Sequence, residues 1–215
     1  MVMPYRCSTF LGNLELNNMI DTSMEIEQKI SVIVAGLRHI DNAWEICEMI
    51  EVAAKIRGTG IAKRNPLYIV QKIQEGKAII AFDNNKVIGF CYVETWEHGK
   101  YVANSGLIVD PEYRAVGLAK LIKAEAFKLS RKRYPQAKIF GLTTSLPVMK
   151  INSELGYRPV TFSELTRDES FWKGCSSCVN YDILQRTDRK MCLCTGMLFD
   201  PSKNGTPNSS EGENK

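Results

Sequence analysis

The sequence has no apolar run long enough to cross a membrane. Its longest runs, at residues 31–37 and 77–82, are far shorter than the roughly 20 residues that a membrane-spanning helix needs. Residues 1–14 also contain no continuous apolar segment of the kind found in a secretory signal. We therefore expect a cytoplasmic protein that has no membrane partner.

The chain also lacks a strong excess of either charge. It carries 28 Lys and Arg against 24 Asp and Glu, which gives a net charge of +4. A face that binds nucleic acid is usually strongly basic, so nucleic acid is not an expected partner. A mild positive charge does suit small anionic ligands.

The composition is that of an ordinary globular protein with a real core. Hydrophobic residues make up 44% and charged residues 24% of the 215 residues, a length close to that of one domain. No repeat of fixed period is present. We expect a flexible leader at residues 1–23, a core domain at 24–165, an extension packed on it at 166–200 and a disordered polar tail at 201–215.

Hydrophobic periodicity predicts an α+β fold. The order is one strand, two helices, three antiparallel strands, and then helix, strand, helix and a last central strand, which favours a mixed, mostly antiparallel sheet with helices on both faces. The helix from residue 118 to 133 is expected to carry its Lys and Arg side chains on the outer face. The predicted strands are residues 29–40, 78–82, 87–95, 102–109, 138–144 and 157–161, and the predicted helices are 41–56, 66–76, 118–133 and 147–155.

The most informative stretch is the junction of a strand and a helix at residues 106–119. The sequence there enters the helix through Arg114-x-x-Gly117-x-Ala119. Such a junction leaves backbone N–H groups unpaired at the positive end of the helix dipole, and small residues keep side chains away from a bulky anion. The pattern favours a pyrophosphate site, although a small residue packed at an ordinary strand-to-helix turn would give the same letters.

With its flanking segments, this junction resembles the GCN5-related N-acetyltransferase (GNAT) superfamily. The resemblance covers roughly residues 30–160 and includes the closing Gly156-Tyr157 pair. It implies the GNAT fold and a catalytic domain at 24–165. It also implies that the end of the strand at Ile108 and Val109 pairs with the pantetheine arm and that the loop holds the pyrophosphate. The implied acyl-CoA-binding residues are Ile108, Val109, Arg114, Ala115, Val116, Gly117, Leu118 and Ala119.

Two positions depart from the family pattern. Asn152 stands where many members have a tyrosine that protonates the leaving thiolate, and Ser105 stands where many have a glutamate base. An amide has no acidic proton to give, and a serine hydroxyl can at most position a water. Glu94 and His98 are the nearest titratable substitutes, although each is also explained as an ordinary surface residue. The candidate catalytic residues are Glu94, Ser105 and Asn152.

The acceptor pocket is expected at the segment between the first two helices. It contains two glycines and the basic residues Arg57, Lys63 and Arg64, which could bind carboxylates, or which could form only a solvated basic turn. If they bind substrate, the acceptor is an acidic amino acid.

Seven cysteines are scattered along the chain, and they are expected to be reduced thiols. Four of them form a C-x-x-C pair and a C-x-C pair in the extension, a spacing that could hold zinc. The C-x-C pair lies on an apolar run, residues 191–199, where both sulfurs would point into a core, so we do not assign a metal. The four are Cys175, Cys178, Cys192 and Cys194.

The predicted function is the transfer of an acetyl or succinyl group from acetyl-CoA or succinyl-CoA to a small acidic amino acid. The chain resembles the stand-alone bacterial N-acylglutamate synthases of arginine biosynthesis, which implies glutamate as the acceptor. A protein or peptide N-acetyltransferase and a non-catalytic CoA-binding sensor are the alternatives. The expected partners are therefore small molecules, and a homodimer is left open.

Overall fold

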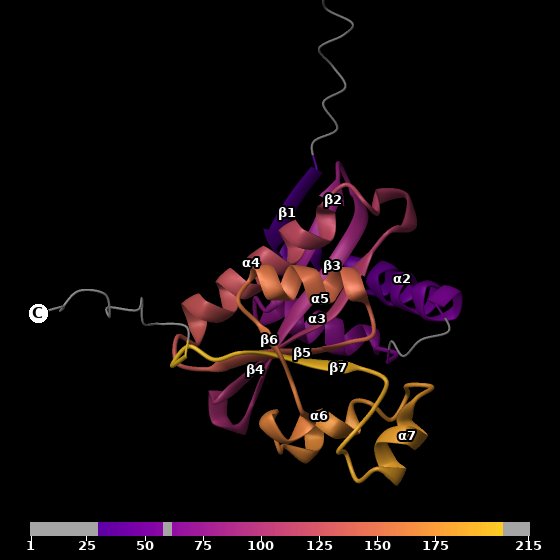
Figure 1. Ribbon diagram of the computed structural model, residues 1–215. Coiled ribbons are helices and arrows are strands. Elements are labelled where there is room, and N and C mark those ends of the chain that lie inside the picture. Colours follow the sequence, from indigo (N-terminus) through magenta and orange to yellow (C-terminus); the bar gives the residue numbers. More distant parts are fainter. Residues whose placement is uncertain (1–29, 58–61, 204–215) are drawn as a thin grey trace, which may run out of the picture.

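The computed structural model describes residues 30–57 and 62–203 (Figure 1). The predicted leader, the glycines of the segment between the first two helices and residues 204–215 of the predicted tail lie outside these described residues. In the described part, no helix is both long enough and apolar enough to span a membrane.

A mixed, mostly antiparallel sheet forms the centre of the molecule, as the sequence predicts, and it has seven strands in the described residues. The strand order is β1-β2-β3-β4-β5-β7-β6, and every neighbouring pair is antiparallel except β4 and β5. The strands are β1 (Ile30–Val34), β2 (Ala78–Asp83), β3 (Lys86–Trp96), β4 (Tyr101–Val109), β5 (Lys138–Thr143), β6 (Arg158–Val160) and β7 (Thr195–Phe199).

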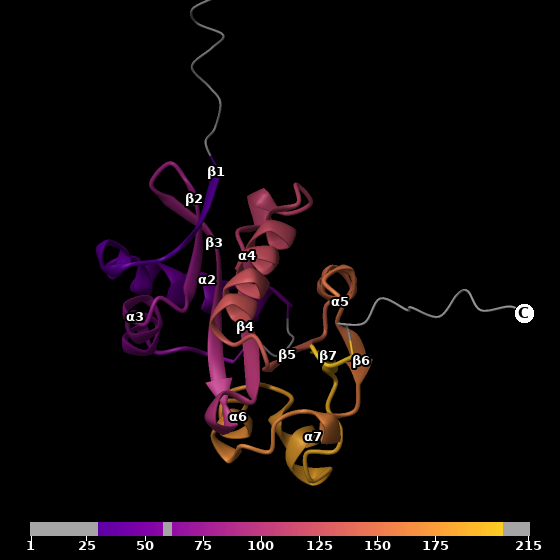
Figure 2. The same cartoon turned by 90° about the vertical axis from the view of Figure 1, so that its left-hand side faces the viewer.

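Helices cover both faces of the sheet, because the strands alternate apolar side chains between the two sides. Ile80 and Phe82 face α2 and α3, whereas Ile79 and Ala81 face α4. Figure 2 shows α2 and α3 on one side of β2 and β3, and α4 on the other. The helices are α2 (Asn42–Arg57), α3 (Pro66–Gln74), α4 (Leu118–Arg133), α5 (Leu146–Glu154), α6 (Glu169–Lys173) and α7 (Tyr181–Arg186), with short 3₁₀ turns η1 (Leu37–His39), η2 (Glu97–Gly99), η3 (Pro111–Tyr113) and η4 (Phe162–Glu164).

The first strand is shorter than the sequence predicts. β1 ends at Val34, because Gly36 begins the 3₁₀ turn η1, which occupies the rest of the predicted range. The apolar residues of this turn are therefore not part of a strand, and Leu37 is exposed.

A β-bulge shifts the register between β3 and β4. Gly106 and Leu107 of β4 lie opposite the single residue Cys91 of β3, and the register shifts there by one residue. Gly106 has φ +68°, and a Cβ at this position would lie 2.7 Å from the ring of Tyr92. On its other edge, β4 pairs with β5 only as far as Ala103, so the two strands separate beyond this point.

The extension supplies a strand to the sheet, at a place that the sequence did not predict. β7 lies between β5 and β6, and β6 is the edge strand rather than a central one. α6 and α7 pack against the same end of the sheet and bury Trp172 and Leu184 beside Phe140. Residues 191–194 precede β7 instead of belonging to it, so the predicted apolar strand is only half correct.

Candidate functional site

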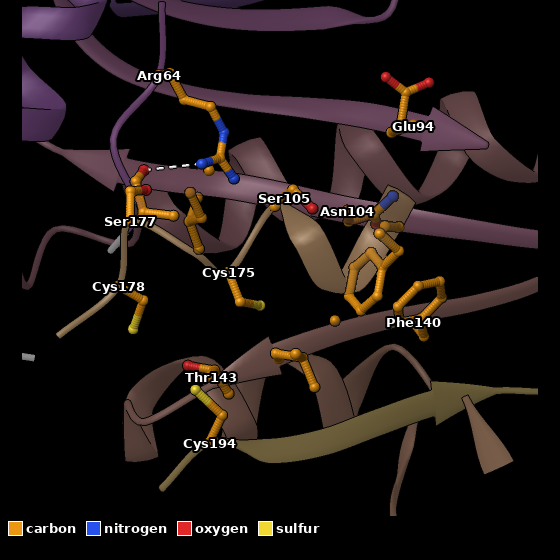
Figure 3. Close-up of a pocket in the computed structure, with 18 of the residues that line it drawn as sticks. Arg64, Glu94, Asn104, Ser105, Phe140, Thr143, Cys175, Ser177, Cys178 and Cys194 are labelled. Carbon is orange, nitrogen blue, oxygen red and sulfur yellow. Dashed lines mark hydrogen bonds between the residues drawn. The ribbon is translucent and has the colours of Figure 1, made fainter. Parts of the chain in front are cut away.

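A cavity of about 560 Å³ opens where β4 and β5 separate. Its walls come from the middle of β4, the end of β5, the segment before α3, and the extension. Figure 3 shows Arg64 and Glu94 on one side of the cavity, Thr143 and Cys194 on the other, and Ser105 between them. The chain thus brings together residues that lie more than 100 positions apart.

The loop that enters α4 has the open donors that the sequence predicts. Ala115 and Gly117 both have positive φ, +67° and +86°, and Gly117 is the N-cap of α4. Within residues 30–57 and 62–203, no acceptor bonds the backbone N–H groups of residues 115–119. Two left-handed residues next to a helix N-terminus make a concave set of donors that suits an anion.

The side chain of Arg114 adds donors beside this candidate anion site. Its Nε and Nη2 atoms are buried and have no hydrogen-bond partner in the described chain. A buried guanidinium nitrogen without an acceptor costs free energy, so its presence indicates an acceptor supplied by a ligand. A phosphate group offers oxygens in a geometry that guanidinium binds well.

None of the eight predicted cofactor-binding residues lines the cavity. Ile108 and Val109 are buried, pair with β3, and belong to the cores on the two faces of the sheet. The residues of β4 that line the cavity are 103–107, which include Ser105. The separation from β5 therefore begins earlier along β4 than the resemblance implies.

Asn152 lines the cavity from α5 and is 1% exposed. Its Oδ1 has no hydrogen-bond partner among the described residues. Asn152 can therefore accept a hydrogen bond from a ligand there, but as an amide it cannot supply a proton to a leaving group.

Glu94 lines the cavity but is bound in a cluster of charges. Its Oε2 accepts a hydrogen bond from the hydroxyl of Tyr68 at 2.9 Å and pairs with Lys72, and its Oε1 lies 3.5 Å from Nζ of Lys77. Burial alone would raise the pKa of Glu94, but its contacts with Lys72 outweigh burial and lower the pKa. A carboxylate held in this way is a weak base. His98, its alternative, lies in η2 and is not among the residues that line the cavity.

Of the three predicted acceptor residues, Arg64 is placed best. Its Nε donates to the hydroxyl of Tyr92 at 2.9 Å and its Nη1 to the carbonyl of Ala62 at 2.9 Å, whereas its Nη2 has no acceptor in the described chain. Lys63 also lines the cavity, but its side chain is 68% exposed. Arg57 is the last residue of α2, and its side chain lies outside the described residues.

The extension forms part of the cavity wall. The hydroxyl of Ser177 accepts a hydrogen bond from the backbone N–H of Lys63 at 3.1 Å, which joins the extension to the segment before α3. The four cysteines of the extension all line the cavity. Burial, followed by the neighbouring thiols, raises the pKa of Cys175 to about 11 and that of Cys194 to about 12. Among the residues that the structure describes, no group of three or more Cys, His, Asp or Glu could hold a metal ion.

Lys123 is a cavity residue that the sequence prediction assigned to the wrong face. It lies on α4 and is 2% exposed, not on the outer surface of the helix. The signal was present, because Lys123 is spaced three residues before the buried Ala126 and seven before the buried Ser130, on the same face of the helix. The sequence prediction placed Lys123 on the solvent-facing side of α4 because lysine is charged.

Comparisons with known proteins agree with this geometry. Residues 64–147 match the model of the acetyltransferase (GNAT) family. No curated protein sequence matches the chain.

Several solved structures share the fold. N-acetylglutamate synthase from Neisseria gonorrhoeae, complexed with coenzyme A and N-acetyl-glutamate, has a TM-score of 0.59 at 17% identity, over 81% of this chain and 35% of that one. A Mycobacterium tuberculosis protein in complex with CoA has a TM-score of 0.58 at 16% identity, over 79% of this chain and 98% of that one. Diaminobutyrate acetyltransferase from Paenibacillus lautus, with L-2,4-diaminobutyric acid and coenzyme A, has a TM-score of 0.55 at 10% identity, over 84% of this chain and 99% of that one. At these identities the likeness is one of fold, and the present chain spans about a third of the Neisseria protein.

Proposed function

We propose that this chain, whose residues 64–147 match the GNAT family model, is a member of that family and transfers an acetyl group from acetyl-CoA to the amino group of a small acidic amino acid. Glutamate is the proposed acceptor. The observation that carries the proposal is a single cavity that has Arg64 at one end and the gap between β4 and β5 beside it.

The donor side supports acyl-CoA as the first substrate. The unpaired N–H groups of residues 115–119 and the two buried nitrogens of Arg114 offer donors to the pyrophosphate. Beyond Ala103, the edge of β4 that faces β5 is free to hydrogen-bond an amide of the pantetheine arm. These contacts recognise the part that acetyl-CoA and succinyl-CoA share, so succinyl-CoA is the second donor to test.

The acceptor side supports a small anionic substrate. Arg64 is fixed by Tyr92 and Ala62 and keeps one terminal nitrogen for a carboxylate. The extension covers this end of the cavity, where a long peptide would need an open groove. The acceptors of the Neisseria and Paenibacillus enzymes, as their names state, are also amino acids.

In the proposed reaction, the free amine attacks the thioester carbonyl, and positioning of the two substrates supplies much of the rate. Ser105 remains the predicted group that positions a water to remove the ammonium proton. We also propose a place for the enzyme at the start of arginine biosynthesis in the cytoplasm, since N-acylglutamate would be its product.

The test is a panel of free amino acids, together with a lysine-rich peptide, crossed with acetyl-CoA and succinyl-CoA. Release of the CoA thiol is followed with a thiol reagent. We expect glutamate with acetyl-CoA to give the highest kcat/KM, glutamine a lower value and the peptide none. A peptide that outcompetes glutamate would favour the protein acetyltransferase, and CoA binding without any thiol release would favour the sensor.

A further inference from the structure

Lys123 is a buried lysine that has no counter-ion among the described residues. Burial lowers its pKa, the Cys91 thiol on β3 acts in the opposite direction, and the ammonium lies 5.3 Å from the centre of the Tyr157 ring. None of the described residues accepts a hydrogen bond from its Nζ or forms an ion pair with it. An unpaired ammonium is expensive to bury, and packing alone would be served as well by a methionine. Its retention therefore indicates a use.

The position of Lys123 relates it to the donor substrate. β4 and β5 separate after Ala103 and Phe140, and Lys123 lines the cavity together with Asn104 and Asn152. Lys123 also belongs to α4, the helix whose N-terminus holds the donors for the pyrophosphate. The proposed function brings the thioester into this gap, so the sulfur of CoA would meet a side chain from the floor of the cavity.

Two tyrosine hydroxyl groups donate their protons elsewhere. Tyr157 donates its hydroxyl proton to Asn104 at 3.0 Å, and burial raises the pKa of Tyr157 well above its usual value. Tyr68 donates to Glu94 at 2.9 Å. Tyr92 accepts a hydrogen bond from Arg64 and packs with the core on the α2 and α3 side of the sheet. It is the rival that an experiment must separate from Lys123.

We propose that the ammonium group of Lys123 protonates the CoA thiolate as it leaves. This role rests on the proposed function and fills the place that Asn152 leaves without an acid. The amine, after losing one proton to water, attacks the carbonyl carbon and forms the C–N bond. The C–S bond then breaks, its electron pair goes to sulfur, and the Lys123 proton makes the CoA thiol. The second proton lost by the nitrogen returns the lysine to its charged form, so the reaction releases one proton overall.

The lowered pKa of Lys123 suits this role. A general acid works best when its pKa is close to the working pH, and a thiol has an ordinary pKa of about 8.5. A cation beside the sulfur would also stabilise the thiolate of bound CoA.

Lys123→Met tests the proposal, because methionine keeps the apolar stem and removes the proton. We expect kcat to fall about a hundredfold or more, with the Kd of CoA and the melting temperature little changed. The alkaline limb of the wild-type pH profile should disappear. Lys128→Met, on the same helix and 76% exposed, is the matched control and should behave like the wild type.

A second measurement needs no acceptor. The thiolate absorbance of bound CoA, taken as the difference between enzyme bound to CoA and enzyme bound to desulfo-CoA, gives the pKa of the bound thiol. We expect this pKa to be higher in Lys123→Met than in the wild type. An equal thiol pKa, an unchanged kcat, or loss of the alkaline limb in Tyr92→Phe instead would overturn the role of Lys123. If the wild type transfers no acyl group to glutamate but the thiol pKa of bound CoA still differs between Lys123→Met and the wild type, the proposed function is wrong and the role of Lys123 stands.

Discussion

The proposed donor and acceptor sides are built in different ways. The proposed donor side is one continuous stretch, from the bulge at Gly106, which lines the cavity, to Ala119 beyond it, and its donors are mostly backbone groups. The acceptor side joins the segment before α3, the middle of β3 and an extension about 80 residues further along the chain. A backbone site depends on local conformation, whereas an acceptor wall of side chains depends on the packing of distant segments.

The largest expected effect tests whether the acceptor wall depends on the extension. Trp172 is 5% exposed, packs on Phe162 and Phe171, and donates Nε1 to the carbonyl of Thr166 at 2.8 Å. Trp172→Ala should lower the free energy of unfolding by about 3–5 kcal/mol and raise the KM of the amino acid more than that of acetyl-CoA. Urea unfolding and steady-state kinetics measure the two effects.

The matched control for that substitution is Trp44→Ala, because Trp44 is 55% exposed. It should change the free energy of unfolding by well under 1 kcal/mol. Similar losses in the two variants would mean that the extension does not share the core of the domain.

The next effect separates the basic residues of the acceptor end. Arg64→Ala removes a charge-assisted contact worth about 1.5–3 kcal/mol, so kcat/KM for glutamate should fall roughly 10- to 100-fold while the KM of acetyl-CoA stays constant. Lys63→Ala, which removes an exposed side chain, should change kcat/KM less than about threefold. Wild-type kinetics with glutamate in Arg64→Ala would exclude this arginine as the carboxylate-binding group.

A smaller effect is expected at the donor side. Gly117→Asp places a negative charge at the helix N-terminus where the pyrophosphate is expected, so the KM of acetyl-CoA should rise at least about tenfold, or 1.4 kcal/mol. Gly99→Asp is the control, since Gly99 has the same φ of +86° and equally open surroundings at the far end of β4. If the KM of acetyl-CoA rises equally in both variants, the rise comes from backbone strain and not from the charge at Gly117.

The smallest effect concerns the ion pairs behind the acceptor wall. Burial raises the pKa of Glu75, but its hydrogen bonds with Lys77 and Lys72 outweigh burial and bring the pKa to about 2, below the ordinary 4.5. A carboxyl with a lowered pKa adds stability above its ordinary pKa, and this stability is lost as the pH falls toward the folded value. The wild type should therefore lose about 1 kcal/mol more than Glu75→Gln between pH 5 and pH 2, after allowance for solvent screening. Chemical unfolding at each pH gives the difference, and parallel curves would contradict it.

The sequence predicted most of what depends on local pattern. The limits of α4, the loop with Gly117 and the hairpin of β2 and β3 follow from helix periodicity and turn residues, which act over a few positions. The place of β7 in the sheet could not be predicted, because a strand at the end of the chain can pair with any open edge.

The candidate site was predictable to the same extent. The loop at Arg114 was predicted to bind an anion from local sequence alone, whereas the burial of Lys123 and the ion pairs of Glu94 depend on side chains from three elements. From residue type alone, a lysine on a helix is expected to face solvent, since lysine is rarely buried. The burial of Lys123 follows only from the packing of α4 against the sheet.

The position of β7 affects how the molecule is completed during synthesis. β6 lies at the edge of the sheet, and its neighbour is β7, which the ribosome makes roughly 35 residues later, or about two to seven seconds at the usual rate. During this interval β5 has an unpaired edge and β6 has nothing to pair with. The nascent chain can therefore form the donor side first, while the acceptor wall has to wait for the last strand.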